Sequence, residues 1–159
     1  MITRVLSTAG LLCGLLFSGL ALAQQPAPTP APALTYALAE QAMTAALAEA
    51  RANNWNLTIV VADEYGLPVM IHRMDGASAR SYEIALAKAK VVHETGLSSG
   101  EYGTRLAAGQ IEEVEGGVTF AGGVPVMRGG VRIGAVTSSG ARGIEDEQVS
   151  LKGAAAISN

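Results

Sequence analysis

The sequence contains a single cysteine, Cys13, and this residue lies inside an apolar N-terminal run. We expect the run to be removed during export, which leaves a mature chain without cysteine. Such a chain can form no disulfide bond, and it offers no thiolate nucleophile and no thiolate metal ligand. Thiol chemistry is therefore excluded from the candidate functions.

Basic residues are also few. The chain has 11 lysines and arginines against 14 acidic residues, a formal net charge of −3 at pH 7. Domains that bind nucleic acid concentrate positive charge in a patch or stripe. No segment of this chain does so, and we expect no nucleic-acid partner. Aromatic residues make up only 4% of the sequence, and the many small residues favour closely packed helices and close contacts between subunits.

The motifs of several common enzyme classes are missing as well. The two histidines, His72 and His93, lack the close spacing of an HExxH zinc site. Ser138 and Ser139 lie outside any GxSxG elbow, and no P-loop lysine follows the glycines that begin at Gly122. The residues offer no dedicated proton donor, so we expect a binding protein rather than an enzyme.

The N-terminal residues predict export. A positive start, Met1 to Arg4, precedes the uncharged run Val5 to Leu22, and Ala21-Leu22-Ala23 has the small residues that a signal peptidase accepts. The run of about 18 residues is close to the lower limit for a membrane span, so an uncleaved anchor is the alternative. Its glycines and serines favour cleavage after Ala23. We predict a signal peptide over 1–23 and a periplasmic or secreted protein.

Residues 24–33 read QQPAPTPAPA. Alternating proline and alanine favour an extended, polyproline-like segment with no core to bury. We predict a linker here, followed by one folded domain over 34–159, a length of roughly 125 residues that suits a single core.

The hydrophobic pattern of this domain predicts alternating helices and hairpins. Gly129-Gly130 is a strong signal for a two-residue hairpin turn, and hairpins require antiparallel pairing. The fold class is therefore α+β, an antiparallel sheet of two hairpins with helices packed on it. The predicted helices are 36–52, 78–95, 98–108 and 144–157; the predicted strands are 57–63, 67–74, 124–127 and 131–136; loops are expected at 111–123, with a possible short strand at 118–121, and at 138–143.

The helix over 78–95 carries apolar residues on two sides. At about 100° per residue, the side expected to face the sheet holds Ile84, Ala87, Val91, Val92 and Thr95. A second stripe holds Tyr82, Leu86, Ala89 and His93. A helix that is apolar on two sides needs a second partner besides the sheet, either a subunit or a ligand. His93 is the best single ligand candidate on this stripe, and an interface histidine is the alternative.

Lys88 projects from the middle of the predicted sheet-facing side. An unpaired buried charge is costly, so this ammonium group must reach an edge or find a carboxylate. One interpretation pairs it with an acidic ligand group, such as a haem propionate. The other is an internal ion pair with Asp63 or Asp75 that fixes the hairpin to the helix.

The second predicted strand has a related pattern. Strand alternation places Met70, His72 and Met74 on one face and Val69 and Ile71 on the other. Methionine and histidine are neutral axial ligands of haem iron, although ordinary packing explains the methionines equally well. His72 and Met74 are therefore further ligand candidates.

Several stretches resemble, in order and spacing, the GlcG/HbpS-like family of small haem-binding domains. The resemblance covers Leu34 to Ile157 and is carried by the following segments: LT before the first helix, VVADEYGLPVMIHRMDGA at 60–77, IALAKA at 84–89, GGVPV at 122–126, VRIGAVTSSG at 131–140 and EDEQVSLKGAAAI at 145–157. One departure is the run Val136-Thr137-Ser138-Ser139, where the family usually has glycine-valine-serine after GA.

The resemblance implies a three-layer α/β/α arrangement, homo-oligomers and haem as cofactor. It also implies iron or redox sensing beside a membrane sensor protein, and in some members haem degradation. We therefore expect an exported haem-binding protein with His93 as the axial iron ligand, His72 or Met74 as the next choices, Lys88 or Arg73 near the propionates, and Tyr82 on the ligand side. The alternatives are a haem-degrading, iron-releasing enzyme and a non-catalytic oligomeric partner of an envelope sensor.

Overall fold

The computed structural model describes residues 32–158. The predicted signal peptide and all but the end of the predicted linker lie outside these residues. The described part has four helices and four strands, in the following order: α1 (Tyr36–Ala52), β1 (Thr58–Asp63), β2 (Pro68–Arg73), α2 (Ala79–Thr95), α3 (Ser99–Ala107), β3 (Gly123–Arg128), β4 (Val131–Ser139) and α4 (Gly143–Ala155).

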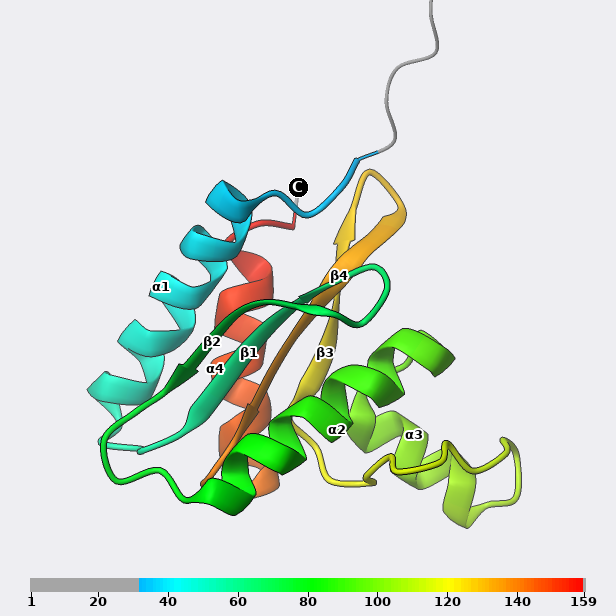
Figure 1. Ribbon diagram of the computed structural model, residues 1–159. Helices are drawn as coiled ribbons and strands as arrows, with labels where there is room; N and C mark the ends of the chain where they lie inside the picture. Colours follow the sequence, from blue (N-terminus) through cyan, green and yellow to red (C-terminus); the bar gives the residue numbers. More distant parts are fainter. Residues whose placement is uncertain (1–31, 159) are drawn as a thin grey trace, which may run out of the picture. The chain divides into compact units, whose positions relative to one another are not determined.

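The elements form three layers. The strands make one antiparallel sheet in the order β2-β1-β4-β3. Helices α1 and α4 cover one face of this sheet, and α2, with α3 beside it, covers the other (Figure 1). The predicted fold class, an α+β sheet of two hairpins between helices, is confirmed.

Local signals explain where the predicted elements begin and end. The side chain of Thr35 accepts a hydrogen bond from the Leu38 amide and caps α1, and Ser78 caps α2 in the same way. Gly96 ends α2 in the left-handed conformation, at φ 72°. Gly129 and Gly130 both have positive φ, as a tight hairpin turn requires.

The main core lies between the sheet and helices α1 and α4. Helix α1 contributes mainly alanines, and Ala42 and Ala46 are fully buried. Such small side chains let α1 and α4 approach each other and the sheet closely. At the centre of this contact, the backbone of Gly153 in α4 lies against Ala42 of α1.

Irregularities interrupt both hairpins. The β1–β2 register shifts between Val61 and Ala62, and the β3–β4 register shifts between Val126 and Met127. An extra residue reverses the side-chain alternation beyond it. In β4 the shift leaves Ile133 in the main core. The two outer strands also contain prolines, Pro68 in β2 and Pro125 in β3.

Two predicted loops are different in the structure. Strand β4 continues to Ser139, because it lies between β1 and β3 and its pairing with β1 extends to Thr58 opposite Ser139. The predicted loop at 138–143 was therefore wrong for its first two residues, Ser138 and Ser139, which are buried in β4. The possible strand at 118–121 is not formed, and this segment is loop.

The predicted orientation of α2 was wrong in part. Ala85 and Ala89 pack on the sheet against Val60 and Ala62 of β1, and Val92, as predicted, is buried beside the sheet, next to Gly123 of β3. Val91 faces α3, where it contacts Tyr102. Helix α2 crosses the sheet obliquely (Figure 1), so its buried arc falls between the two predicted stripes. Leu86 and Ala89 therefore belong to the sheet contact rather than to a separate apolar side.

The close contact at Gly153 gives a test of this packing. Replacing an interior helix glycine with alanine usually stabilises a protein by about 0.5–1 kcal/mol. At Gly153 the added Cβ would lie 2.9 Å from the Ala42 carbonyl oxygen and 3.0 Å from Val136 Cγ1. We expect Gly153→Ala to lower the free energy of unfolding by about 1–3 kcal/mol, measured by urea denaturation.

The control is Gly143→Ala in the same helix, where the nearest atom to an added Cβ is 3.5 Å away. This change should leave the free energy of unfolding within about 0.5 kcal/mol of the parent protein. If Gly153→Ala is as stable as the parent, the close approach of α1 and α4 is not a constraint.

Candidate functional site

Lys88 of α2 forms a buried ion pair with Asp146 of α4. The Lys88 Nζ–Asp146 Oδ2 distance is 2.9 Å, and Nζ also donates a hydrogen bond of 2.7 Å to the Ser138 carbonyl oxygen of β4. The lysine is 0% exposed. An internal ion pair was one of the two predicted interpretations, but the expected partners, Asp63 and Asp75, were wrong.

The two acids that were expected to pair with Lys88 have other positions or other hydrogen bonds. Asp63 Oδ1 accepts hydrogen bonds from the Tyr65 and Leu67 amides at 3.0 and 2.9 Å, so it shapes the β1–β2 turn. Asp75 is exposed after β2. Because Lys88 is fully buried and bound to Asp146, it is not available to a haem propionate at the surface.

Burial dominates the electrostatics of this pair. Removal from water lowers the pKa of Lys88, although the Asp146 charge partly opposes the change. Burial likewise raises the pKa of Asp146, against the effect of the lysine charge. Burial thus disfavours the charged forms of both groups, and their mutual attraction opposes this effect.

Hydroxyl groups complete the surroundings of the pair. Ser138 Oγ donates to the Asp146 carbonyl oxygen, and Ser150 Oγ donates to the Gly122 carbonyl oxygen at 2.8 Å. Among the described residues, no buried side-chain nitrogen or oxygen lacks a hydrogen-bond partner. Ser138, which sequence reasoning placed in a loop, is thus part of the buried polar network.

His93 lies near the C-terminal end of α2, half-buried against the β1–β2 turn. Its Nδ1 is 2.9 Å from the Glu64 carbonyl oxygen. A carbonyl can only accept, so Nδ1 carries the proton, and in the neutral ring Nε2 keeps its lone pair. Metal-binding histidines are commonly oriented by this kind of hydrogen bond. The ring is therefore held in a form that can coordinate a metal.

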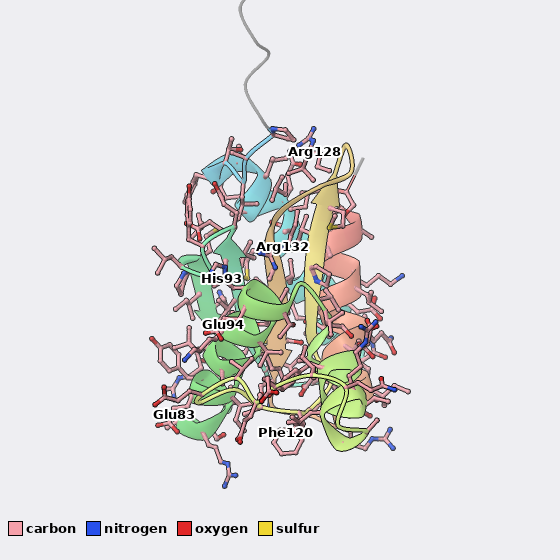
Figure 2. The ribbon with its side chains drawn as sticks, turned by 90° about the vertical axis from the view of Figure 1, so that its right-hand side faces the viewer. Glu83, His93, Glu94, Phe120, Arg128 and Arg132 are labelled. Atoms are coloured by element: carbon pink, nitrogen blue, oxygen red, sulfur yellow. The ribbon has the colours of Figure 1, made fainter. Side chains whose placement is uncertain are left out.

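The surroundings of His93 are open. The turn that it contacts carries two exposed apolar side chains, Tyr65 and Leu67. Arg132 lies beside the end of α2, where its guanidinium group donates to the Val92 carbonyl oxygen. Figure 2 shows His93 and Arg132 on the α2 side of the sheet. This neighbourhood offers one imidazole and one cation on an exposed surface.

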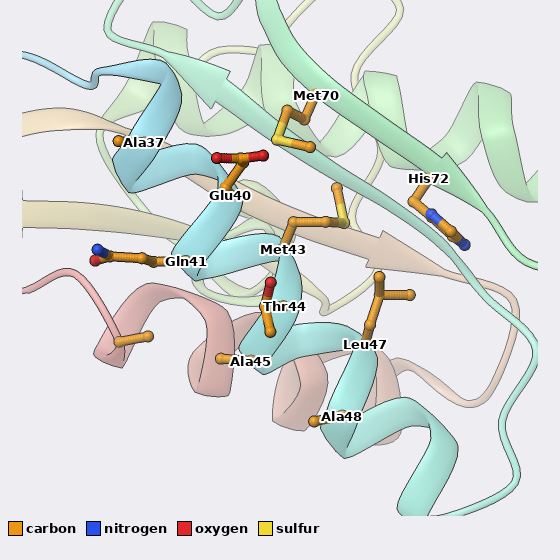
Figure 3. Close-up of a pocket in the computed structure, with 11 residues that line it drawn as sticks. Ala37, Glu40, Gln41, Met43, Thr44, Ala45, Leu47, Ala48, Met70 and His72 are labelled. Carbon is orange, nitrogen blue, oxygen red and sulfur yellow. The ribbon is translucent and has the colours of Figure 1, made fainter.

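His72 lies on the opposite side of the sheet, at the border of two hollows. The first, here called the α1–β2 groove, has a volume of about 950 Å³. Figure 3 shows its apolar part, where Met43 and Leu47 of α1 face Met70 and His72 of β2. The predicted alternation is confirmed for Met70 and His72, which share this groove. The prediction that Val69 lies with Ile71 was wrong, because Val69 packs against the main core next to the register shift between Val61 and Ala62.

The second hollow at His72 is polar. It has a volume of about 460 Å³, and its lining includes Arg51 from the end of α1 together with Arg73 and Met74. We call it the arginine hollow. Asp75 also lines this hollow, so His72 has an apolar groove on one side and a hollow of mixed charge on the other.

Of the remaining candidates, Tyr82 lies apart from His72, and Met74 shares the arginine hollow with it. Tyr82 is 39% exposed and lines a hollow of about 430 Å³ with Ile71 and Arg73, on the α2 side. Met74 is half-buried and packs against the main core. The two histidines are on opposite faces of the sheet, so one chain cannot bring both to the same iron.

Sequence reasoning missed two residues of these sites. Asp146 and Arg51 were not among the predicted site residues. Neither has a local signal, because each meets its partners across the fold. Within residues 32–158 no cluster of three or more His, Cys, Asp or Glu side chains could hold a metal ion, and no helix there is long and apolar enough to cross a membrane.

Comparison with known proteins places the chain in a family. The family described as haem-degrading, HbpS-like proteins matches residues 34–155. The chain belongs to the HbpS-like family. None of the curated proteins matches it. The GlcG/HbpS-like resemblance seen in the sequence is thus confirmed.

Solved structures agree with this assignment. A double mutant of HbpS from Streptomyces reticuli is 30% identical, with a TM-score of 0.73 over 86% of this chain and 95% of that one. Another HbpS crystal structure is 31% identical, with a TM-score of 0.73 over 86% and 99% of the two chains. A PduOC–haem complex, 24% identical, has a TM-score of 0.67 over 79% and 96%, and it shares the fold of the HbpS-like domain.

The buried pair generates a prediction for stability and pH. Lys88→Met leaves Asp146 buried without a cation, and removing one partner of a buried pair costs about 3–5 kcal/mol. In this variant the pKa of Asp146 rises further, because the lysine that lowers it is gone. A folded-state pKa above the unfolded value gives stability at low pH that is lost as the pH rises. We therefore expect the cost to be largest near neutral pH and to decrease toward acid pH, measured by urea denaturation.

Lys90→Met is the matched control, since Lys90 is exposed on the same helix. It should change the free energy of unfolding by less than about 1 kcal/mol at every pH. The double variant Lys88→Met/Asp146→Leu removes both charges and should recover much of the loss. A pH-independent effect of Lys88→Met would contradict the assignment of the buried charge.

Proposed function

We propose that this HbpS-like domain binds haem at the α1–β2 groove, with His72 as the axial ligand. The observation that carries the proposal is the position of His72 between an apolar groove and the arginine hollow. Haem has matching parts, namely an apolar macrocycle, two carboxylates on one edge and an iron that accepts an imidazole nitrogen.

The residues present fit each part of the ligand. The groove volume of about 950 Å³ is within the range of ligand sites, about 300–1,000 Å³. Met43, Leu47 and Met70 would contact the apolar macrocycle. Arg51 and Arg73 lie where the carboxylates would find cations, and guanidinium groups bind carboxylates in a bidentate manner.

Relatives support the choice of ligand. The family is described as haem-degrading, and PduOC, which shares the fold, was crystallised as a haem complex. The assignment of the haem-binding residues in this chain rests on its own geometry and not on those proteins.

His93 is the alternative ligand in this proposal and was the first choice from the sequence. Its Nδ1 contact with Glu64 holds the ring in a suitable form, and Arg132 lies nearby. The His72 side chain is exposed and lines the α1–β2 groove and the arginine hollow, whereas His93 is half-buried and lines none of the hollows described above, and this difference favours His72. Either histidine would bind haem from its own face of the sheet.

Haem degradation with iron release is a second candidate function, favoured by the family description. The groove holds Glu40 and Thr44 as polar residues beside the apolar side chains. An enzyme of this kind would bleach bound haem in the presence of a reductant or peroxide faster than free hemin is bleached. Binding and degradation would use the same groove, so hemin titration tests the step that both functions require.

We further propose that the protein is exported to the periplasm or secreted. We also propose that it acts as a homo-oligomer together with a membrane sensor protein. Export follows from the positive start and apolar run of residues 1–22. Protein recovered from the envelope or medium of an expressing cell should begin at Gln24 when its N-terminus is sequenced. An N-terminus at Met1 would contradict cleavage.

Hemin titration of the mature domain tests the haem site. We expect a Soret shift that saturates at one haem per chain, and loss of axial ligation in His72→Ala, with affinity reduced by about 10-fold to 100-fold, a range comparable to the loss of a supporting group at a metal site. Arg51→Ala should weaken binding less and leave the Soret position unchanged, because it removes a carboxylate contact and not an iron ligand.

His93→Ala is the matched control on the opposite face of the sheet. A spectrum like that of the parent is expected for His93→Ala; a lost Soret shift in this variant alone would move the site to the α2 side. No shift in the parent protein at stoichiometric hemin would remove the haem proposal. The molecular mass from size-exclusion chromatography, measured with and without hemin, distinguishes the haem proposal from a purely oligomeric role, in which hemin does not change the mass.

A further inference from the structure

A small cavity lies beside the buried ion pair, on the far side of the fold from the α1–β2 groove. Its volume is about 240 Å³, and its lining includes Lys88, Asp146, Phe120 and Ser139. Phe120 is 55% exposed, although its backbone is fixed by the hydrogen bond from Ser99 Oγ to its carbonyl oxygen, 2.7 Å long. The ring lies at the surface of the molecule (Figure 2).

Small residues keep this cavity open. Ala121, Ala141 and Gly143 form part of its wall. At Gly122, an added Cβ would lie 2.6 Å from both Lys88 Nζ and Asp146 Cβ, so the chain needs glycine where the backbone approaches the amine. The space next to Lys88 is therefore maintained by the absence of side chains.

The two groups at the cavity form a nucleophile and a proton carrier. A buried lysine in its neutral form has a nucleophilic amine, and a nearby carboxyl group can give and take protons. Burial displaces the pKa of Lys88 downward and that of Asp146 upward, which increases the fraction of both neutral forms. A buried pair that only joined two helices would not require an adjoining cavity.

We propose that this cavity is a second ligand site, in which Lys88 forms an imine with a small, uncharged aldehyde or ketone. The Lys88 Nζ lone pair attacks the carbonyl carbon and forms a carbon–nitrogen bond. The Asp146 carboxyl group gives its proton to the carbonyl oxygen, and the resulting carboxylate takes a proton from the nitrogen. Asp146 then protonates the hydroxyl group, the carbon–oxygen bond breaks, water leaves, and the iminium nitrogen returns its proton to Asp146. Amine and carbonyl are consumed, imine and water are formed, and no oxidant or reductant is needed.

The charges around the cavity favour an uncharged ligand. Glu145 and Asp146 lie in the first turn of α4, and Glu147 acts electrostatically on Lys88. These acids disfavour a carboxylate or phosphate next to the pair. The volume of about 240 Å³ restricts the ligand to a few heavy atoms.

Reductive trapping with acetaldehyde and cyanoborohydride tests the site on the folded, full mature domain. Each imine that forms is reduced to an ethylated lysine, which peptide mapping by mass spectrometry locates. Lys90 and Lys152, both exposed, are comparators in the same molecule. We expect Lys88 to be labelled faster than either at pH 7, because burial lowers its pKa and increases the fraction of neutral amine. This preference should decrease as the pH rises toward 10.

Labelling of Lys90 and Lys152 without Lys88, or an equal rate at the three lysines, would overturn the proposal and leave the pair as a structural cross-link only. Circular dichroism of the labelled protein must match that of the parent, because unfolding would expose Lys88 like any other lysine. The haem proposal is independent of this result, since the groove and the cavity share no residue.

Two variants make the test specific. Phe120→Ala opens the entrance without touching the ion pair and should speed the labelling of Lys88 while leaving Lys90 unchanged. An unchanged rate at Lys88 would overturn this entrance. Asp146→Asn keeps the size of the side chain but cannot carry the proton; in folded protein it should slow the labelling of Lys88 about tenfold or more, in line with general acid–base contributions. A parent-like rate would overturn the role of Asp146.

Discussion

The contact between Lys88 and Asp146 fixes the relative positions of the three layers. One amine binds a carboxylate of α4 and a carbonyl oxygen of β4 while it projects from α2, so helices on opposite sides of the sheet are joined near its end. A charge removed from water is tolerated only when every partner is in place. The arrangement therefore has little freedom, and Gly122 is required beside it, since an added Cβ would collide with both members of the pair.

The sequence predicts the elements well because their signals are local. Caps at Thr35 and Ser78, the Gly96 terminus and the paired glycines of the second hairpin each act within a few residues. The facing of α2 could not be predicted in the same way. Both of its stripes are apolar, and only the oblique crossing of the sheet decides that Ala85 and Ala89 face β1. The length of β4 was underestimated because its last serines have polar side chains whose partners lie in α4.

In the candidate sites, too, local patterns could be predicted and long-range contacts could not. Alternation along β2 correctly placed Met70 and His72 together, because a strand has a period of two wherever it pairs regularly. The guanidinium group of Arg51 joins them from the end of α1, and Asp146 reaches Lys88 across 58 residues of sequence. Pairings of this kind depend on the packing of distant elements. A single sequence shows that a buried lysine needs an acid, and several acids meet that description equally well.

The outer strands have a consequence for how copies of this protein can meet. Each carries a proline and an irregular register, Pro68 with the shift near Val61 and Pro125 with the shift near Val126. Proline supplies no amide hydrogen, and a bulge bends the rim of a sheet. Neither rim is a good template for a further strand, so the sheet resists extension from chain to chain into fibrils. A second copy would therefore have to meet this one through its helical surfaces.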